Sequence, residues 1–184
     1  MRKNFGSKPW LFPEPVLIIG TYDEKNKPNA MNAAWGSMYD YDKLEINLAE
    51  HKTTENIRIK KAFTVSMATK STLKVSDFVG IVSGTKDPNK MKKAGLHDVK
   101  SEFVDAPIFL EYPLTFECEL ESLGDDLRVV GKIINISADE SILTNGKIDS
   151  EKLEAIAFDP FNNKYILVKD VVGNAFKDGL ELNK

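Results

Sequence analysis

The chain has 184 residues, of which 42% are hydrophobic and 29% charged, a composition typical of a folded globular protein rather than a disordered one. Its net charge of −3 at pH 7 argues against nonspecific nucleic-acid binding, which needs a clustered positive surface. No apolar run reaches the roughly 18–20 residues of a membrane helix, so we expect no membrane contact. The length suits one domain over residues 1–184 with a substantial core.

The cysteine count indicates a reducing compartment. Cys118 is the only cysteine, so no intrachain disulfide can form, and the first residues lack the apolar core of a secretory signal. We therefore expect a cytoplasmic protein. Cys118 alternates with apolar residues in "LTFECEL" and stands between two glutamates, which predicts a buried structural thiol rather than a nucleophile.

Hydrophobic alternation and turn residues predict short strands and helices in the first half of the chain. In chain order we expect a hairpin of strands 15–22 and 29–35 across the turn at 23–28, a strand at 44–48, a helix from residue 52, a strand at 63–68, and helices at 71–80 and 88–95. The helix from residue 52 has a threonine as its expected N-cap and Glu55 in its first turn. Pro88 and Gly95 mark the ends of the last helix.

Long strands dominate the second half. We expect strands at 114–122 and 127–137, joined through 124–126, with a β-bulge where the alternation changes near Ile133 and Ile134, and a last strand near 165–168. No repeat or linker divides the chain. Long antiparallel strands with few helices predict a mainly β fold, a closed barrel with short peripheral helices.

Motifs for most kinds of chemistry are absent. The sequence has no GxGxxG, no Walker motif and no Gly-x-Ser-x-Gly elbow, and neither His51 nor His97 has a second ligand at metal-site spacing. We therefore expect no metal site and no catalytic residue of the hydrolase type. The lysines at 60, 61, 90, 92 and 93 are interpreted as solvated helix faces.

Two features point to a ligand. The segment "NAMNAAWG" (29–36) offers small residues where a strand usually has branched ones, and small residues let a large group approach the backbone. "HKTT" (51–54) stands at a strand-to-helix junction, where free N–H groups and the helix dipole favour an anion. An ordinary threonine cap with a solvated lysine also explains "HKTT" taken alone. Together the two segments suit a planar ligand with a phosphate tail.

Several longer segments resemble one known family. "PVLIIGTYDEKNKPNAMNAAWGSMYDYDKLEINLAEHKTTENI", "FTVSMA", "DFVGIVSG", "KAGLHDVKSEFVDAPIFLEYPLTFECEL" and "VGNAFKDG" are similar to the flavin reductase-like proteins of the flavoredoxin type, over nearly the whole chain. The resemblance implies an FMN-binding split β-barrel, the cofactor FMN, and a homodimer with FMN near the subunit interface. The run "EPVLIIG" lacks alternation and so fits a strand covered on both faces, by a partner or by the chain's own helices.

The resemblance also implies which residues bind the cofactor. The segment Asn32, Ala33, Ala34 and Trp35 would lie along the flavin ring, although Trp35 could instead be a core aromatic. Lys52, Thr53 and Thr54 would take the phosphate. The remaining expected contacts are Ala68, Asp77 and Ser83, and, from the C-terminus of this chain or of a partner, Asn174, Ala175, Phe176 and Lys177.

The activity implied is flavin redox chemistry, in which hydride passes from NAD(P)H to the flavin and electrons leave to a partner or a free acceptor. Such chemistry is carried by the cofactor, which agrees with the missing catalytic motifs. Two alternatives remain open: a non-enzymatic flavin-binding carrier or sensor, and, less favoured by these segments, a split-barrel enzyme that binds pyridoxal phosphate.

Overall fold

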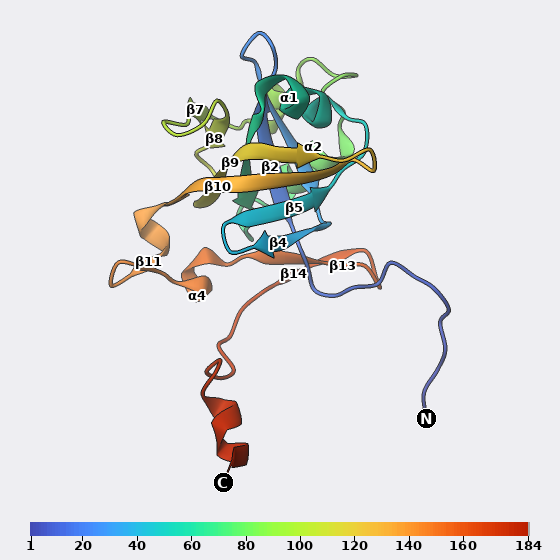
Figure 1. The fold of residues 1–184 in the computed structure, drawn as a ribbon, viewed down its shortest axis with the longest axis vertical. Helices are drawn as coiled ribbons and strands as arrows, with labels where there is room; N and C mark the ends of the chain where they lie inside the picture. Colours follow the sequence, from blue (N-terminus) through green and yellow to red (C-terminus); the bar gives the residue numbers. More distant parts are fainter. Residues whose placement is uncertain (184) are drawn as a thin grey trace.

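The computed structural model describes residues 1–183 and consists mainly of antiparallel strands (Figure 1). Seven strands form one curled sheet, a half-barrel in which each strand pairs antiparallel with its neighbours. In spatial order they are β3 (Pro28–Ala33), β2 (Leu17–Tyr22), β6 (Ala62–Met67), β9 (Leu114–Leu123), β10 (Arg128–Ala138), β5 (Lys43–Asn47) and β4 (Gly36–Asp40). The predicted mainly β, split-barrel fold is confirmed, but the sheet is not the closed barrel expected from the strand pattern, because β3 and β4 remain as its two unpaired edges.

Smaller elements surround this sheet. A three-stranded sheet and two short ribbons comprise β1 (Glu14–Pro15), β13 (Ile156–Asp159) and β14 (Lys164–Leu167); β7 (Asp98–Lys100) and β8 (Pro107–Phe109); and β11 (Leu143–Thr144) and β12 (Lys147–Ile148). The helices are α1 (Lys52–Lys60), α2 (Leu73–Ile81), α3 (Lys90–Ala94) and α4 (Ser150–Leu153), with 3-10 turns η1 (Glu140–Ile142) and η2 (Asp178–Asn183). No helix among residues 1–183 is long and apolar enough to cross a bilayer.

The predicted hairpin, the long strand pair and the bulge are all present. β2 pairs with β3 from Leu17 opposite Ala33 to Tyr22 opposite Pro28. The register of β10 against β9 shifts between Ile133 and Asn135, which is the bulge predicted from the change of alternation.

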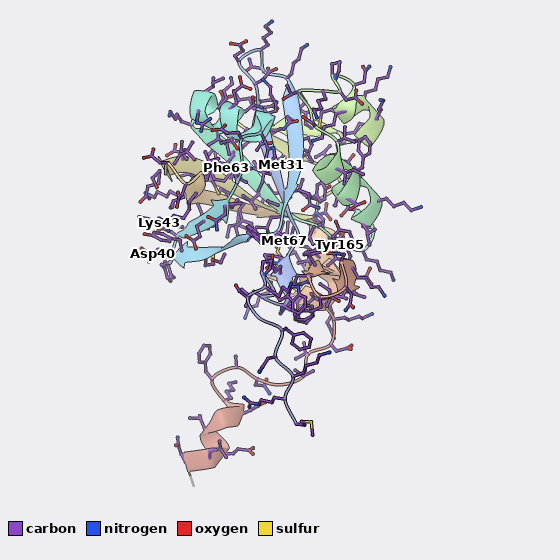
Figure 2. All side chains as sticks on the ribbon, turned by 90° about the vertical axis from the view of Figure 1, so that its right-hand side faces the viewer. Met31, Asp40, Lys43, Phe63, Met67 and Tyr165 are labelled. Carbon is purple, nitrogen blue, oxygen red and sulfur yellow. The ribbon has the colours of Figure 1, made fainter. Side chains whose placement is uncertain are left out.

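Both faces of β2 are covered by the chain itself. Ile18 belongs to one buried cluster with Val79 and Phe109, and Ile19 belongs to a second cluster with Phe63. Figure 2 labels Phe63, a buried member of this second cluster, and Met31, which packs against it. The missing alternation of "EPVLIIG" therefore requires no partner subunit, and the chain's own elements account for it.

The start of α1 differs from the sequence-based expectation. His51, not a threonine, occupies the N-cap position, and its side chain makes no capping hydrogen bond. The threonine hydroxyls have other partners: Nδ2 of Asn29 donates to Oγ1 of Thr53 at 2.9 Å, and Oγ1 of Thr54 donates to the carbonyl of Ala49 at 2.6 Å. These two hydrogen bonds fix the first turn of α1 to β3 and to the loop that precedes α1. Glu55 does lie in the first turn, as predicted.

Candidate functional site

A cavity of about 450 Å³ opens where the end of β3, the start of α1 and the end of α2 come together. Asn47 at the end of β5 and the two residues after it complete the wall of the cavity. Its lining residues are Asn29, Met31, Asn32, Ala33, Ala34, Trp35, Asn47, Leu48, Ala49, His51, Lys52, Thr53, Val79, Gly80, Ile81, Val82, Ser83, Gly84 and Lys90. The two segments singled out in the sequence, 29–36 and 51–54, thus border one space although they belong to different elements.

One wall is made by the small residues at the end of β3. Ala33 and Ala34 are only half-buried and line the cavity, so no large side chain stands between the backbone and the space. Next to them, Nδ2 of Asn32 donates to the carbonyl of Ser76 at 3.0 Å, which ties β3 to α2. A Cβ added at Gly80 would lie 3.0 Å from Cβ of Asn32, so the two elements approach closely at this point.

Trp35 stands at the rim of the cavity. Its side chain is 55% exposed, which excludes the alternative that it is a core aromatic. Trp35, Ala34 and Asn47 also border a second hollow of about 650 Å³, which lies against the N-terminal segment at Trp10 and Leu11. Trp35 therefore borders two spaces, each large enough for a ring system.

The opposite end of the cavity is formed by the N-terminus of α1. The amide of Glu55 donates to the carbonyl of His51 at 3.1 Å and begins the helical hydrogen-bond ladder. The amides of Lys52, Thr53 and Thr54 precede that bond and have no acceptor within the helix. Together with the helix dipole, such amides form an environment that favours an anion.

The ionisable side chains that line the cavity are all basic. They are His51, Lys52 and Lys90, and no carboxylate is among the described lining residues, although the whole chain carries a net charge of −3. Nζ of Lys52 lies 3.5 Å from Oε2 of Glu55 in a partly exposed pair, which is weak enough to leave the ammonium available. The cavity therefore has an apolar, small-residue end and a positive end.

The structure brings half of the predicted site residues to the cavity and places the other half elsewhere. Those that line it are Asn32, Ala33, Ala34, Trp35, Lys52, Thr53 and Ser83. Thr54 is fully buried beside it, and its hydroxyl hydrogen is used by Ala49. Ala68 is buried in the apolar cluster around Ile18, and Asp77 accepts a hydrogen bond from the hydroxyl of Tyr165 at 2.8 Å.

The expected C-terminal contacts lie away from the cavity within one chain. Asn174, Ala175, Phe176 and Lys177 are exposed, in a segment that extends from the body of the molecule (Figure 1). Phe176 is completely exposed. In this structure the segment therefore does not contact the cavity of its own chain. The prediction that these four residues contact the cofactor remains only for the cavity of a second subunit.

Among the cavity residues that the sequence reasoning missed, two make side-chain hydrogen bonds. Asn29 was regarded as part of a small-residue strand, yet its amide positions Thr53. Lys90 was interpreted as part of a solvated helix face. That interpretation is correct for Lys92 and Lys93, which are exposed, and wrong for Lys90, which is 3% exposed. A lysine just after Pro88, within a run of lysines, carries no local signal that would distinguish it from its neighbours.

Other kinds of site find no support. Among residues 1–183, no group of three His, Cys, Asp or Glu residues could hold a metal ion. Cys118 is buried, as predicted, and burial, followed by the neighbouring Glu117, raises the pKa of its thiol to about 12. A thiol of this kind stays protonated at neutral pH and is a poor nucleophile.

Comparison with known proteins decides the family. The model of the flavin reductase like domain matches residues 10–152, well over half of the chain. The chain belongs to the flavin reductase-like family. The flavoredoxin of Desulfovibrio vulgaris (Miyazaki F) is 31% identical with a TM-score of 0.93, and the alignment covers 97% of this chain and 100% of that one.

Members of this family from other organisms share the same architecture. The flavoredoxin of Methanosarcina acetivorans is 28% identical with a TM-score of 0.88, and the alignment covers 99% of this chain and 100% of that one. The FMN-binding domain of a flavin reductases-like enzyme from Shewanella baltica shares the fold, with 20% identity, a TM-score of 0.78, and coverage of 88% and 89%. Family membership supports the expected cofactor, FMN, and a role in oxidation and reduction.

Proposed function

We propose that the chain binds FMN in the cavity described above and works as an NAD(P)H-dependent flavin oxidoreductase. The observation that carries the proposal is the pairing, in one cavity, of a small-residue wall with a positive helix N-terminus. A flat apolar ring suits the first, and a phosphate monoester suits the second. The residues present therefore fit the cofactor at both of its ends.

The contribution of the chain is binding and orientation. The backbone of Ala33 and Ala34 would face the ring, and the free amides of α1, with Lys52 and the Thr53 hydroxyl, would hold the phosphate. Bound there, FMN would supply two-electron redox chemistry between a nicotinamide and an acceptor. No lining side chain has to act as a nucleophile or a general acid, in agreement with the inert thiol of Cys118.

The second hollow supports a place for the electron donor. It meets the cavity at Ala34, Trp35 and Asn47, so a nicotinamide lying there would be next to the ring wall. The electron acceptor is a partner protein or a free small molecule.

We further propose that the working unit is a homodimer. Residues 170–183 extend from the body and include Val171, Val172, Phe176 and Leu180, all at least 60% exposed. An arm with so many exposed apolar residues is stabilised when it packs against another surface, and a second copy supplies one. In such a dimer, Asn174 to Lys177 would reach the partner's cavity. A single buried cysteine is consistent with the cytoplasm as the location.

The purified protein tests the proposal. A visible absorption band of oxidised flavin that co-purifies or appears on adding FMN supports the cofactor, and its bleaching by NADH or NADPH without oxygen supports the enzyme. A flavin band that neither nucleotide bleaches would favour a non-enzymatic carrier or sensor. A protein that takes up pyridoxal phosphate but no flavin would overturn the proposal, an outcome that the family match disfavours.

A further inference from the structure

Glu14 is a buried carboxylate for which the described chain provides no partner. The residue is 6% exposed, and its Oε2 atom is buried without a hydrogen-bond donor among residues 1–183. No described lysine, arginine or histidine nitrogen lies within 4.0 Å of its carboxylate. Burial accordingly raises the pKa of this carboxyl, because the charged form is desolvated. Glutamate is rarely buried unless it is paired, so its side chain is a candidate contact for a ligand.

The carboxylate belongs to the wall of the second hollow. Glu14 lines that space of about 650 Å³ together with Ala34, Trp35 and Asn47, which also line the cavity proposed for the cofactor. Glu14 itself is not among the lining residues of that cavity. Its charge therefore lies beside the ring wall, in the space that the flavin would leave free.

The backbone around Glu14 is held in place. Glu14 stands in β1, which pairs with β13, and the following Pro15 confines it to extended conformations. The segment before β1 is held against the turn after β13, since the ring centroids of Trp10 and Phe12 lie 5.7 and 5.6 Å from that of Phe161. The carboxylate is therefore positioned before any ligand enters the hollow.

The other charges around the hollow do not neutralise Glu14. They are Glu45 and Lys8. Glu45 adds a second negative charge, and its Oε2 pairs only at 3.9 Å with Nη1 of Arg128. Lys8 is exposed, lies over the ring of Trp10 at 5.9 Å from its centre, and makes no ion pair with a described carboxylate. The fixed charge of the hollow is therefore negative, whereas that of the cofactor cavity is positive.

Carboxylates beside aromatic rings suit a planar organic cation. Trp10 and Trp35 border the hollow and are 37% and 55% exposed. The face of a tryptophan attracts cations and also stacks on flat rings. A metal ion is disfavoured, because no group of three potential ligands was found among residues 1–183. The hollow thus fits a flat ring with a positive charge better than it fits a neutral ring.

We propose that the second hollow binds the oxidised nicotinamide ring, a planar pyridinium cation, and that Glu14 is its counter-ion. This inference rests on the proposed function, which places the electron donor in the hollow, and adds to it a residue and a preference for one redox state. The reduced ring is neutral, so the ion pair with Glu14 forms only with the oxidised ring. A hydrogen bond from the carboxamide N–H to the same carboxylate is available in both states.

A counter-ion for the oxidised ring favours electron flow away from the donor. When a dihydronicotinamide is oxidised, one C–H bond breaks, the hydride leaves with its two electrons to the flavin of the proposed function, and the ring is left with one positive charge. Because Glu14 stabilises that charge, binding shifts the nicotinamide couple towards its oxidised form by the factor by which the site prefers this form. The same contact predicts product inhibition by the oxidised nucleotide.

Two small compounds test the inference on the FMN-loaded protein. Nicotinamide and nicotinamide methylated on its ring nitrogen share the ring and the carboxamide, and only the methylated compound is a cation. Ligand-observed NMR titration gives both affinities without any redox reaction. We expect the wild type to bind the cation more tightly by on the order of tenfold or more. Equal affinities for the two compounds overturn the inference without recourse to any variant.

Two variants assign the preference to a residue. Glu14→Gln keeps the size and a hydrogen-bond acceptor and removes the charge, so the preference for the cation should disappear while nicotinamide binds as before. Glu45→Gln is the matched control, removes the more exposed carboxylate of the hollow, and should retain the preference. A preference that persists in Glu14→Gln refutes the role of Glu14 and leaves the flavin proposal standing. A wild-type protein that takes up no FMN refutes the proposed function, and with it the assignment of the hollow to the electron donor.

Discussion

Replacing Thr53 by valine separates the phosphate contact from the rest of the site. The hydroxyl of Thr53 accepts a hydrogen bond from Asn29, so its own hydrogen remains available for a phosphate oxygen. Valine has the same shape without that donor. Losing one hydrogen bond to a charged group costs about 1.5–3 kcal/mol, and at about 1.4 kcal/mol per tenfold this corresponds to FMN binding weakened about 10- to 140-fold. Riboflavin, which has no phosphate, should bind with unchanged affinity.

Two companion variants make this experiment specific. Thr53→Ser retains the hydroxyl and should restore FMN affinity. Thr54→Val removes a neighbouring hydroxyl that already donates to Ala49, so it should lower stability by about 1–3 kcal/mol without changing the ratio of FMN to riboflavin affinity. Thr53→Val also leaves the amide of Asn29 without its acceptor, and thermal unfolding measures that separate cost. Quenching of flavin fluorescence gives both affinities. If Thr53→Val weakens FMN and riboflavin equally, the phosphate does not lie at the start of α1.

Two further predictions concern the ring wall and the assembly. The leucine side chain of Ala34→Leu should occupy the space beside the half-buried wall and abolish FMN binding, while circular dichroism shows a folded protein. The control variant Ala34→Ser should bind FMN normally. Full FMN occupancy in Ala34→Leu would contradict the proposed position of the ring. Light scattering of the FMN-loaded protein should give about twice the chain mass of 20.6 kDa. Dilution should release flavin as the dimer dissociates. A flavin-loaded monomer would refute the proposed dimer.

The sequence predicted those elements whose pattern is local. β2, β9 and β10 are long enough to show their burial pattern, and the bulge at Ile133 was readable from a change in alternation. β4 was missed because it is an edge strand whose residues are mostly exposed. Since neither of its faces is buried, its sequence shows no alternation of apolar and polar residues. The ribbon of β7 and β8 has only three residues in each strand, too few for a pattern.

The site was predictable where the backbone itself needs a special residue. The sequence shows directly the small residues at 33 and 34 and the polar helix start at 51–54. The structure brings both segments to one cavity. Side chains whose role depends on tertiary packing were not predictable. The burial of Lys90 and the contact of Asn29 with Thr53 arise from the packing of α2 and α3 on β3, which no spacing in the sequence reveals. The same holds for the hydroxyl of Thr54, which donates to a carbonyl five residues earlier rather than facing the cavity.

The central claim is that FMN lies in the cavity between β3 and α1, and a crystal structure of the protein with FMN tests it most directly. The account predicts electron density for the ring along Ala33 to Trp35 and for the phosphate within hydrogen-bonding distance of the Lys52 and Thr53 amides. Density for the flavin at any other place, or a phosphate that points away from α1, would contradict it.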